Sequence, residues 1–129
     1  MKKSGIINAQ LAGALAALAH TDLLVIGDAG LPVESSREVV DLAVVYGVPG
    51  FEEVLAAVLD EIVVEAAWVS APVDEFPAAD WIDSRLKEPA ERISHDSFKE
   101  KVGETVLAVR TGEDTPYANV ILRCGVPFA

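Results

Sequence analysis

The chain has 129 residues, 51% of them hydrophobic, and a formal net charge of −11 at pH 7. This length and composition predict one domain, residues 1–129, whose apolar core is large enough to be stable without disulfide bonds. The acidic balance excludes nucleic acid as a partner, because phosphate binding depends on clusters of Lys and Arg that the sequence lacks. The single cysteine, Cys124, excludes an internal disulfide and a structural zinc site, and it fits a reducing compartment.

The N-terminal run of alanines and leucines, which follows two lysines, has some features of a signal peptide. However, Gly5, Asn8 and Gly13 interrupt its apolar block, and residues 20–22 form a poor cleavage region. No stretch reaches the roughly 18 apolar residues that a membrane-spanning helix needs. We therefore expect a soluble, cytoplasmic protein that does not associate with a membrane.

In the first half of the chain, leucines at spacings of four and three predict a helix over residues 10–19. A continuous apolar run predicts a strand over 23–27 that is covered on both faces. Residues 39–45 fit either a helix opened by a capping box at 35–38 or a strand. Their β-branched content and the early stop at Gly47 favour the strand.

The second half continues the alternation of helices and short strands. Apolar spacing, prolines and caps predict helices over 51–60, 77–87 and 94–103, an extended piece after Pro89, and strands over 62–69, 105–109 and 120–122. The stretch SAPVDEFPAAD is predicted to be a loop because of its prolines. The alternation predicts an α/β fold: a single-domain three-layer α/β/α sandwich with a largely parallel or mixed central sheet.

Two ionisable residues flank the first predicted strand. Asp28 follows it directly, at the carboxyl end, where open α/β sheets bind their ligands. An equally weighted alternative is a turn residue whose carboxylate accepts hydrogen bonds from the backbone of residues 29–30. His20 precedes the strand and, as a histidine, can transfer a proton at neutral pH. The alternative for His20 is a cap at the C-terminus of the first helix.

Four further residues are candidates for ligand contacts. His95 and Lys99 lie four residues apart on one face of the same predicted helix, and both can donate hydrogen bonds to a hydroxylated ligand. A surface pair beside Glu100 is the plainer interpretation. Tyr117 and Asn119 stand at the mouth of the last predicted strand and offer groups suited to sugar hydroxyls. A tyrosine packed beside a turn asparagine is an equal alternative.

Several other chemistries have no support in the sequence. GDAGLP is not GxGxxG, and GxxxxGK[ST] is absent, so no nucleotide-binding loop is predicted. Neither CxxC nor HExxH occurs, and two distant histidines do not make a metal site. No serine or cysteine has the pattern of a nucleophile elbow. We therefore expect neither a metal site nor a nucleotide-binding loop.

Four motifs taken together resemble the D-ribose pyranase family, which is related to the L-fucose mutarotases. They are HTDLLVIGDAGLP, GVPGF, HDSFKEKV and RTGEDTPYANVILRCGV, and the resemblance runs in the same order from Lys2 to Phe128. The DAGLP and PYAN forms are closer to the ribose branch than to the fucose branch. The sequence departs from the family's pattern at Ala19, at Gly50 and in a shortened stretch over residues 70–92.

This resemblance implies an isomerase that interconverts the pyranose and furanose forms of ribose without a cofactor. It places the family's general acid on His20, and its sugar-binding residues on Asp28, His95 and residues 117–119, with Lys99 as a weaker match. It also implies a cytoplasmic, ring-shaped homo-oligomer, commonly a decamer.

The length of the first strand raises a question about this site. If residues 22–27 are extended, His20 and Asp28 are separated by roughly 20 Å at about 3.3 Å per residue, too far for one pentose to touch both. Either the chain bends back sharply after His20, or the two groups come from different subunits. We favour two subunits, which makes assembly a condition for activity.

Two other functions stay open from the sequence alone, besides a purely structural oligomer whose melting temperature would not change with sugar. One is a mutarotase for fucose or another monosaccharide, which would use similar groups. The other is a non-catalytic sugar-binding subunit, which would bind sugar without accelerating its isomerisation. Exchange between the ring forms of ribose and of fucose, measured with and without protein, distinguishes the three.

Overall fold

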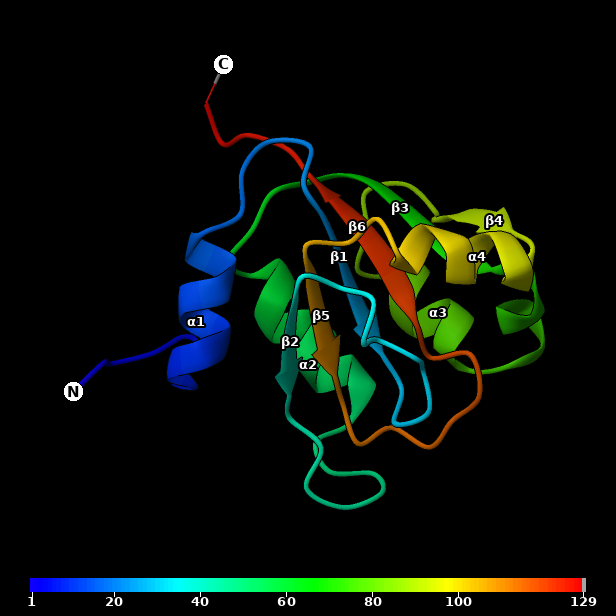
Figure 1. The fold of residues 1–129 in the computed structure, drawn as a ribbon, viewed down its shortest axis with the longest axis horizontal. Coiled ribbons are helices and arrows are strands. Elements are labelled where there is room, and N and C mark those ends of the chain that lie inside the picture. Colours follow the sequence, from blue (N-terminus) through cyan, green and yellow to red (C-terminus); the bar gives the residue numbers. More distant parts are fainter. Residues whose placement is uncertain (129) are drawn as a thin grey trace.

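The computed structural model describes residues 1–128, and Figure 1 shows their strands and helices. The strands are β1 (Leu23–Gly27), β2 (Glu38–Asp41), β3 (Val64–Ser70), β4 (Glu91–Ile93), β5 (Leu107–Arg110) and β6 (Val120–Cys124). The helices are α1 (Ala9–Ala16), α2 (Phe51–Leu59), α3 (Ala78–Asp83) and α4 (His95–Val102), with a 3₁₀-helix, η1, at Ala71–Glu75. Among the described residues, no helix has the length and apolar character that crossing a membrane requires.

The strands form one mixed sheet in the order β2-β5-β1-β6-β3-β4. β6 is antiparallel to both of its neighbours, β1 and β3, whereas the remaining pairs are parallel. The other five strands therefore end at one edge of the sheet, where β6 begins. We name this the carboxyl edge, and its strand-end residues are Gly27, Asp41, Ser70, Ile93, Arg110 and Val120. The opposite end, at Leu23, Glu38, Val64, Glu91, Leu107 and Cys124, is the amino edge.

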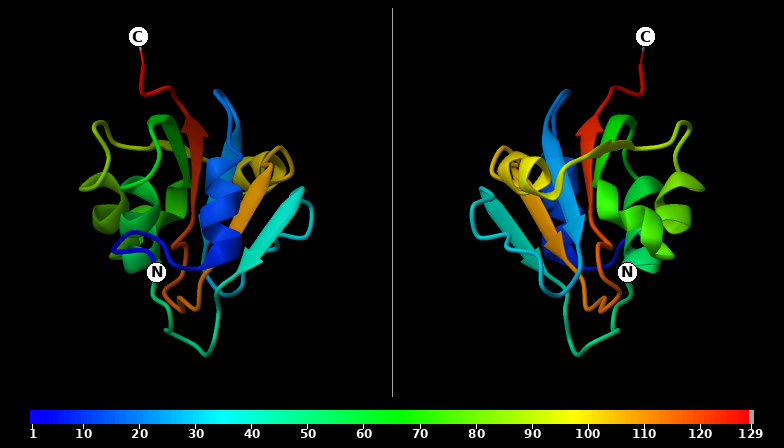
Figure 2. Two further views of the ribbon diagram at one scale, coloured as in Figure 1. Left: turned by 90° about the vertical axis from the view of Figure 1, so that its left-hand side faces the viewer. Right: turned by 90° about the vertical axis from the view of Figure 1, so that its right-hand side faces the viewer.

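Alternating side chains along the central strands explain why both faces of the sheet are covered. Leu24 and Ile26 are fully buried on the face that packs against α1, α2 and α3. Val25, also fully buried, points to the other face, where Phe98 of α4 and residues 28–37 cover it. Figure 2 shows α2 and α3 on one side of the sheet and α4 on the other. The predicted three-layer α/β sandwich with a mixed central sheet is therefore confirmed.

The two elements with the clearest local signals have the predicted positions. β1 spans residues 23–27, as its apolar run predicts. α4 begins after Ser94, whose hydroxyl accepts the Ser97 N–H at 3.1 Å, and it ends before Gly103. Both elements matter for the site, because one ends at Asp28 and the other begins at His95.

The first helix is shorter than predicted. It ends at Ala16 rather than at residue 19, so His20 lies in a turn and does not cap a helix C-terminus. The Asp22 carboxylate accepts the Ala19 N–H at 2.8 Å, and Thr21 has a φ of 71°. These local contacts replace the last predicted helical turn with the turn that leads into β1.

Other boundaries also differ from the prediction. β3 is Val64–Ser70 rather than 62–69, β5 is Leu107–Arg110 rather than 105–109, and β6 extends to Cys124 rather than to residue 122. The strand predicted over 39–45 ends at Asp41, whose carboxylate accepts the Ala43 N–H at 3.0 Å in a turn that takes the chain out of the sheet. The helix predicted over 77–87 is the shorter α3, whose last residue Asp83 accepts the Ala90 N–H at 3.0 Å. Part of the stretch predicted as a loop forms η1.

Candidate functional site

Asp28 and Asn119 form a reciprocal hydrogen-bonded pair at the carboxyl edge. Asp28 follows β1 and Asn119 precedes β6, and the pairing of these strands brings together residues that are 91 positions apart. Asn119 Oδ1 accepts the backbone N–H of Asp28 at 2.8 Å, while Asn119 Nδ2 donates to Asp28 Oδ2 at 3.1 Å. Asn119 is only 3% exposed, so its amide is fixed by the surrounding protein. Its two hydrogen bonds therefore hold the Asp28 carboxylate in one position.

The Asp28 carboxylate also has the turn role that the sequence left open. Its Oδ1 accepts the Gly30 N–H at 2.9 Å. Asp28 is therefore both a turn residue and a side chain at the carboxyl edge of the sheet. Burial raises the pKa of Asp28 above its ordinary value of 3.8. Hydrogen bonds from Gly30 and Asn119, and the charge that His95 can carry, oppose this rise. The result is a half-buried acceptor held by protein donors.

Gly27 is required for the close approach of Asn119. A Cβ at Gly27 would lie 3.0 Å from Asn119 Oδ1 and 2.7 Å from Leu31 Cδ2, both shorter than ordinary contacts. The strand therefore ends in glycine because the amide that positions Asp28 passes directly over it.

Tyr117 lies beside this pair and has an unusual backbone conformation. Its φ is 60°, in the left-handed region, which costs a non-glycine residue of order 1–3 kcal/mol, and residues with such strain cluster at functional sites. The Asn119 N–H donates to the Tyr117 carbonyl at 2.8 Å and supports this conformation. The Tyr117 ring contacts Phe76, at a centroid distance of 5.6 Å, and His95, at 5.3 Å.

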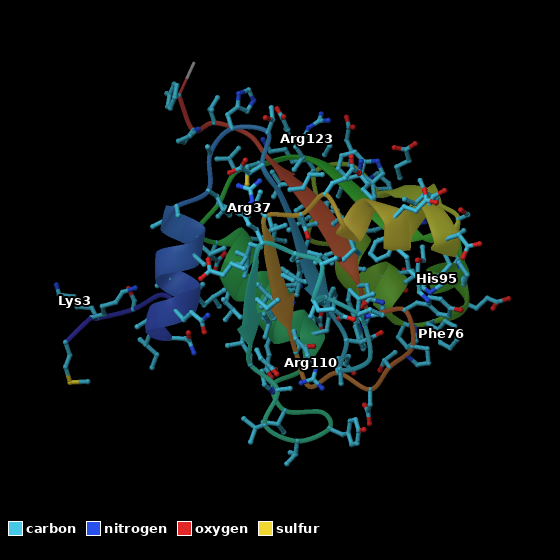
Figure 3. The ribbon with its side chains drawn as sticks, viewed as in Figure 1. Lys3, Arg37, Phe76, His95, Arg110 and Arg123 are labelled. Carbon is cyan, nitrogen blue, oxygen red and sulfur yellow. The ribbon has the colours of Figure 1, made fainter. Side chains whose placement is uncertain are left out.

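His95 is the first residue of α4, and the end of β3 holds it in place. Its Nδ1 lies 2.8 Å from Oγ of Ser70, a residue that is 1% exposed. Its ring meets the Tyr117 ring edge to face at 83°. Figure 3 labels His95 and Phe76, the two residues whose rings contact Tyr117. We name Asp28, Ser70, Phe76, His95, Tyr117 and Asn119 the edge cluster.

Lys99 is not part of this network. It lies one turn beyond His95 on α4, as predicted, but its side chain is exposed. Within residues 1–128 it makes no hydrogen bond or ion pair. The structure thus brings together four of the predicted site residues, Asp28, His95, Tyr117 and Asn119, and leaves Lys99 outside their contacts.

His20 lies at the amino edge, in a separate group of side chains. Its Nε2 is 3.3 Å from Glu65 Oε2, and Arg123 Nε donates to Glu65 Oε1 at 2.9 Å. The hydrogen bond from His20 and the neighbouring guanidinium lower the pKa of Glu65 below 4.5. Figure 3 shows Arg123 near one end of the molecule and Arg110, which ends β5 at the carboxyl edge, near the other.

The chain does not bend back after His20. The Thr21 N–H donates to the Cys124 carbonyl at 2.9 Å, so the turn is fastened at the amino edge and runs directly into β1. The alternative in which one chain folds His20 onto Asp28 is therefore wrong. All of β1 separates the two residues, a spacing of roughly 20 Å.

Four residues of these two groups were missed by the sequence reasoning: Ser70, Glu65, Phe76 and Arg123, the last of which was quoted only within a family motif. Ser70 follows the predicted strand 62–69, the same position that singled out Asp28, and could have been found by that signal. Glu65 is an acidic residue inside an otherwise apolar strand, which is a weaker signal. Phe76 lies in the stretch predicted as a loop, and no local pattern distinguishes it.

The groups that converge at the carboxyl edge suit a hydroxylated ligand. They offer a carboxylate, an amide, an imidazole and a phenol, all hydrogen-bonding groups. Across residues 1–128, no three His, Cys, Asp or Glu side chains come together in a way that could hold a metal ion. A hollow of about 680 Å³ lies elsewhere, beside β3 between residues 59–68 and 85–91, and includes Glu65 but no member of the edge cluster.

Comparisons with known proteins agree with this architecture over the full length. The sequence model of the RbsD / FucU transport protein family matches residues 1–127. The D-ribose pyranase 1 of Rubrobacter xylanophilus is 54% identical over 131 residues, covering 99% of this chain and 100% of that protein. The D-ribose pyranase of Cutibacterium acnes is 47% identical over 128 residues, with the same coverage.

The solved structures give the same result for the fold. Bacillus subtilis RbsD complexed with D-ribose superimposes with a TM-score of 0.92 at 40% sequence identity, covering 99% of this chain and 100% of that one. Sequence and structure are thus similar over one continuous stretch that includes both sheet edges. This chain belongs to the RbsD / FucU transport protein family.

Proposed function

We propose that this chain is a D-ribose pyranase, a cytoplasmic isomerase that interconverts the pyranose and furanose forms of ribose without a cofactor. Two relatives at 47% and 54% identity are D-ribose pyranases, and a structure of 40% identity holds D-ribose. The observation that carries the proposal is the edge cluster. There, a half-buried carboxylate acceptor and several donors are locked in place by one another, as recognition of a small polyol requires.

The reaction needs few catalytic groups. A proton leaves the anomeric hydroxyl and another reaches the ring oxygen as the bond between that oxygen and the anomeric carbon breaks. Closure through a different hydroxyl reverses these transfers and changes the ring size, so atoms and charges balance. One positioned acid or base contributes typically about 10²- to 10⁴-fold, which suffices because sugars already isomerise in water.

In this proposal Asp28, Asn119, Tyr117 and His95 hold the sugar, and His20 moves the proton. Asp28 accepts from neighbouring hydroxyls, and the other three orient the remaining ones. Because His20 lies at the opposite edge of its own sheet, a second subunit supplies it to each site. The proposal therefore includes a homo-oligomer, a closed ring and commonly a decamer, with sites between subunits.

Saturation-transfer NMR tests the activity directly. Irradiating one ring form of ribose should reduce the signal of the other faster with protein than without it. The same measurement with fucose tests the mutarotase alternative, which predicts faster exchange for fucose than for ribose. Binding of ribose without faster exchange would contradict catalysis and favour the sugar-binding subunit.

A complementation experiment tests the shared site. His20→Ala and Asp28→Ala subunits are each inactive in this proposal, but mixed oligomers regenerate some sites in which both residues are present. Mixing after dissociation should restore part of the exchange rate. A mixture that stays inactive while forming mixed oligomers, or a fully active monomer at high dilution, would contradict the two-subunit site.

A further inference from the structure

We propose that Ser70 is a positioning residue that fixes the tautomer of His95, so that His95 presents Nε2–H to the ligand as a donor. The identity of the ligand as ribose rests on the proposed function. The tautomer does not, because it is a property of the protein without ligand.

The contact is buried and built from two adjacent strands. Ser70 is the last residue of β3 and pairs in register with Ile93 of β4, two residues before His95. Ser70 Oγ lies 2.8 Å from His95 Nδ1, and Ser70 is 1% exposed. The parallel pairing of β3 and β4 thus places the hydroxyl and the ring together at the carboxyl edge.

Ser70 directly precedes η1, but its hydroxyl does not cap this 3₁₀-helix. Ser70 is the N-cap residue of this 3₁₀-helix, where a serine hydroxyl usually accepts a backbone N–H. Here the Ser70 side chain makes no such capping bond. Its hydroxyl is directed to His95 in place of the nearby backbone.

The number of protons then determines the tautomer. A serine hydroxyl has one hydrogen to donate, and within residues 1–128 the only partner of Ser70 Oγ is His95 Nδ1. If Nδ1 carried a proton and donated it, the buried hydroxyl hydrogen would have no acceptor among these residues, which is unfavourable. Ser70 therefore donates to an unprotonated Nδ1, and the neutral ring carries its proton on Nε2.

This tautomer makes the edge cluster complementary to a polyol. Within the described chain His95 Nε2 has no hydrogen-bond partner, so it is free to donate to a ligand oxygen. The edge-to-face contact with Tyr117, at a centroid distance of 5.3 Å, limits rotation of the ring. Asp28 is an acceptor held by Asn119, and His95 becomes the matching donor held by Ser70.

Long-range ¹H–¹⁵N NMR correlations of the ligand-free protein test the tautomer. The chain has two histidines, so a His20→Ala variant assigns the His95 signals. We expect the Nε2–H pattern in the wild-type protein and a shift towards mixed tautomers in Ser70→Ala. A wild-type Nδ1–H pattern, or an unchanged pattern in Ser70→Ala, would overturn the inference.

Ser36→Ala is the matched control. Ser36 is also a buried serine, 8% exposed, and its hydroxyl bonds to Thr105 Oγ1 near the amino edge. Removing it deletes a buried hydroxyl of the same kind without touching the edge cluster. The His95 pattern should stay as in the wild type, and a similar change in both variants would indicate a general structural effect and contradict the inference.

Ribose kinetics test the consequence for the site. Ser70→Ala should raise the ribose KM about five- to tenfold, the loss of one donor hydrogen bond, with a smaller change in kcat. Ser70→Thr keeps the hydroxyl and should restore the Nε2–H pattern and most of the affinity. If Ser70→Ala does not fold, the wild-type and Ser70→Thr spectra still decide the tautomer. A wild-type Nε2–H pattern without ribose binding would contradict the proposed function and support the tautomer.

Discussion

The two edges of the sheet hold their polar groups in different ways. At the carboxyl edge Asn119 and Ser70 are almost fully buried and each fixes a neighbour by a short hydrogen bond. At the amino edge the His20 side chain is 52% exposed, and its Nε2 lies 3.3 Å from Glu65 Oε2 in a hydrogen bond open to solvent. The first arrangement favours recognition, because its geometry is set before a ligand arrives. The second leaves the imidazole exposed to solvent, as the proposed two-subunit site requires.

The largest expected effect is the loss of exchange activity in His20→Ala, at the amino edge. We expect exchange between ribose ring forms to slow by about 10²- to 10⁴-fold, because the variant lacks the proposed proton donor. Stability should change by less than about 0.5 kcal/mol, since the side chain is exposed. Saturation transfer and urea unfolding measure the two effects. A large loss of stability would contradict this comparison, because it would mean that the fold depends on the His20 contacts as much as on the buried hydrogen bonds of the carboxyl edge.

Asn119→Ala, unlike His20→Ala, should lower the stability of the fold markedly. It leaves the Asp28 N–H without its acceptor and the carboxylate without one donor, and should lower the free energy of unfolding by about 1–3 kcal/mol. Ribose affinity should fall with it, as measured by calorimetry. Thr105→Val is the control, because it removes a buried hydroxyl that donates to the Val102 carbonyl away from the edge cluster. That variant should lose stability and keep ribose affinity.

The pH dependence of Asp28 tests whether burial dominates at the carboxyl edge. Its folded-state pKa lies above 3.8, so the folded protein binds this proton more tightly than the unfolded chain. The contribution of Asp28 to stability is therefore largest below pH 3.8 and is lost as pH rises through the folded-state pKa. Ribose affinity should rise over the same range, because the ionised carboxylate is the better acceptor.

Carbon-13 NMR of the Asp28 carboxyl group measures that pKa. Asn119→Ala should raise it further, since a hydrogen bond that lowers the pKa is lost. A midpoint at or below 3.8 in the wild-type protein would show that hydrogen bonds outweigh burial and would reverse the expected sign.

The smallest effect is expected for Glu65→Gln at the amino edge. Hydrogen bonds from His20 and Arg123 lower the pKa of Glu65 in the folded protein. The ionised Glu65 therefore stabilises the fold above pH 4.5, and this stabilisation is lost as the pH falls through the folded-state pKa. Because the group is exposed, the thermal midpoint at neutral pH should stay close to the wild type, and added salt should remove the remaining difference. A marked fall in the midpoint at high salt would contradict this view of the amino edge.

Local patterns predicted much of the fold and part of the candidate site. The apolar run before Asp28 and the serine cap before His95 are encoded within a few neighbouring residues, and both elements lie where predicted. The end of the first helix was not predictable in this way. It depends on the Asp22 side chain and on a backbone bond from Thr21 to Cys124, about a hundred positions away along the chain.

The sequence by itself determined the alternation of helices and strands and the placement of Asp28 and Asn119 at strand ends, because periodicity and turn chemistry act over short distances. Only the tertiary structure decided which of these ends meet. The order β1-β6-β3-β4 joins Asp28 to Asn119 and Ser70 to His95, and the same strands separate His20 from all of them. The physical reason is that strand order depends on the packing of the whole sheet, which no single segment contains.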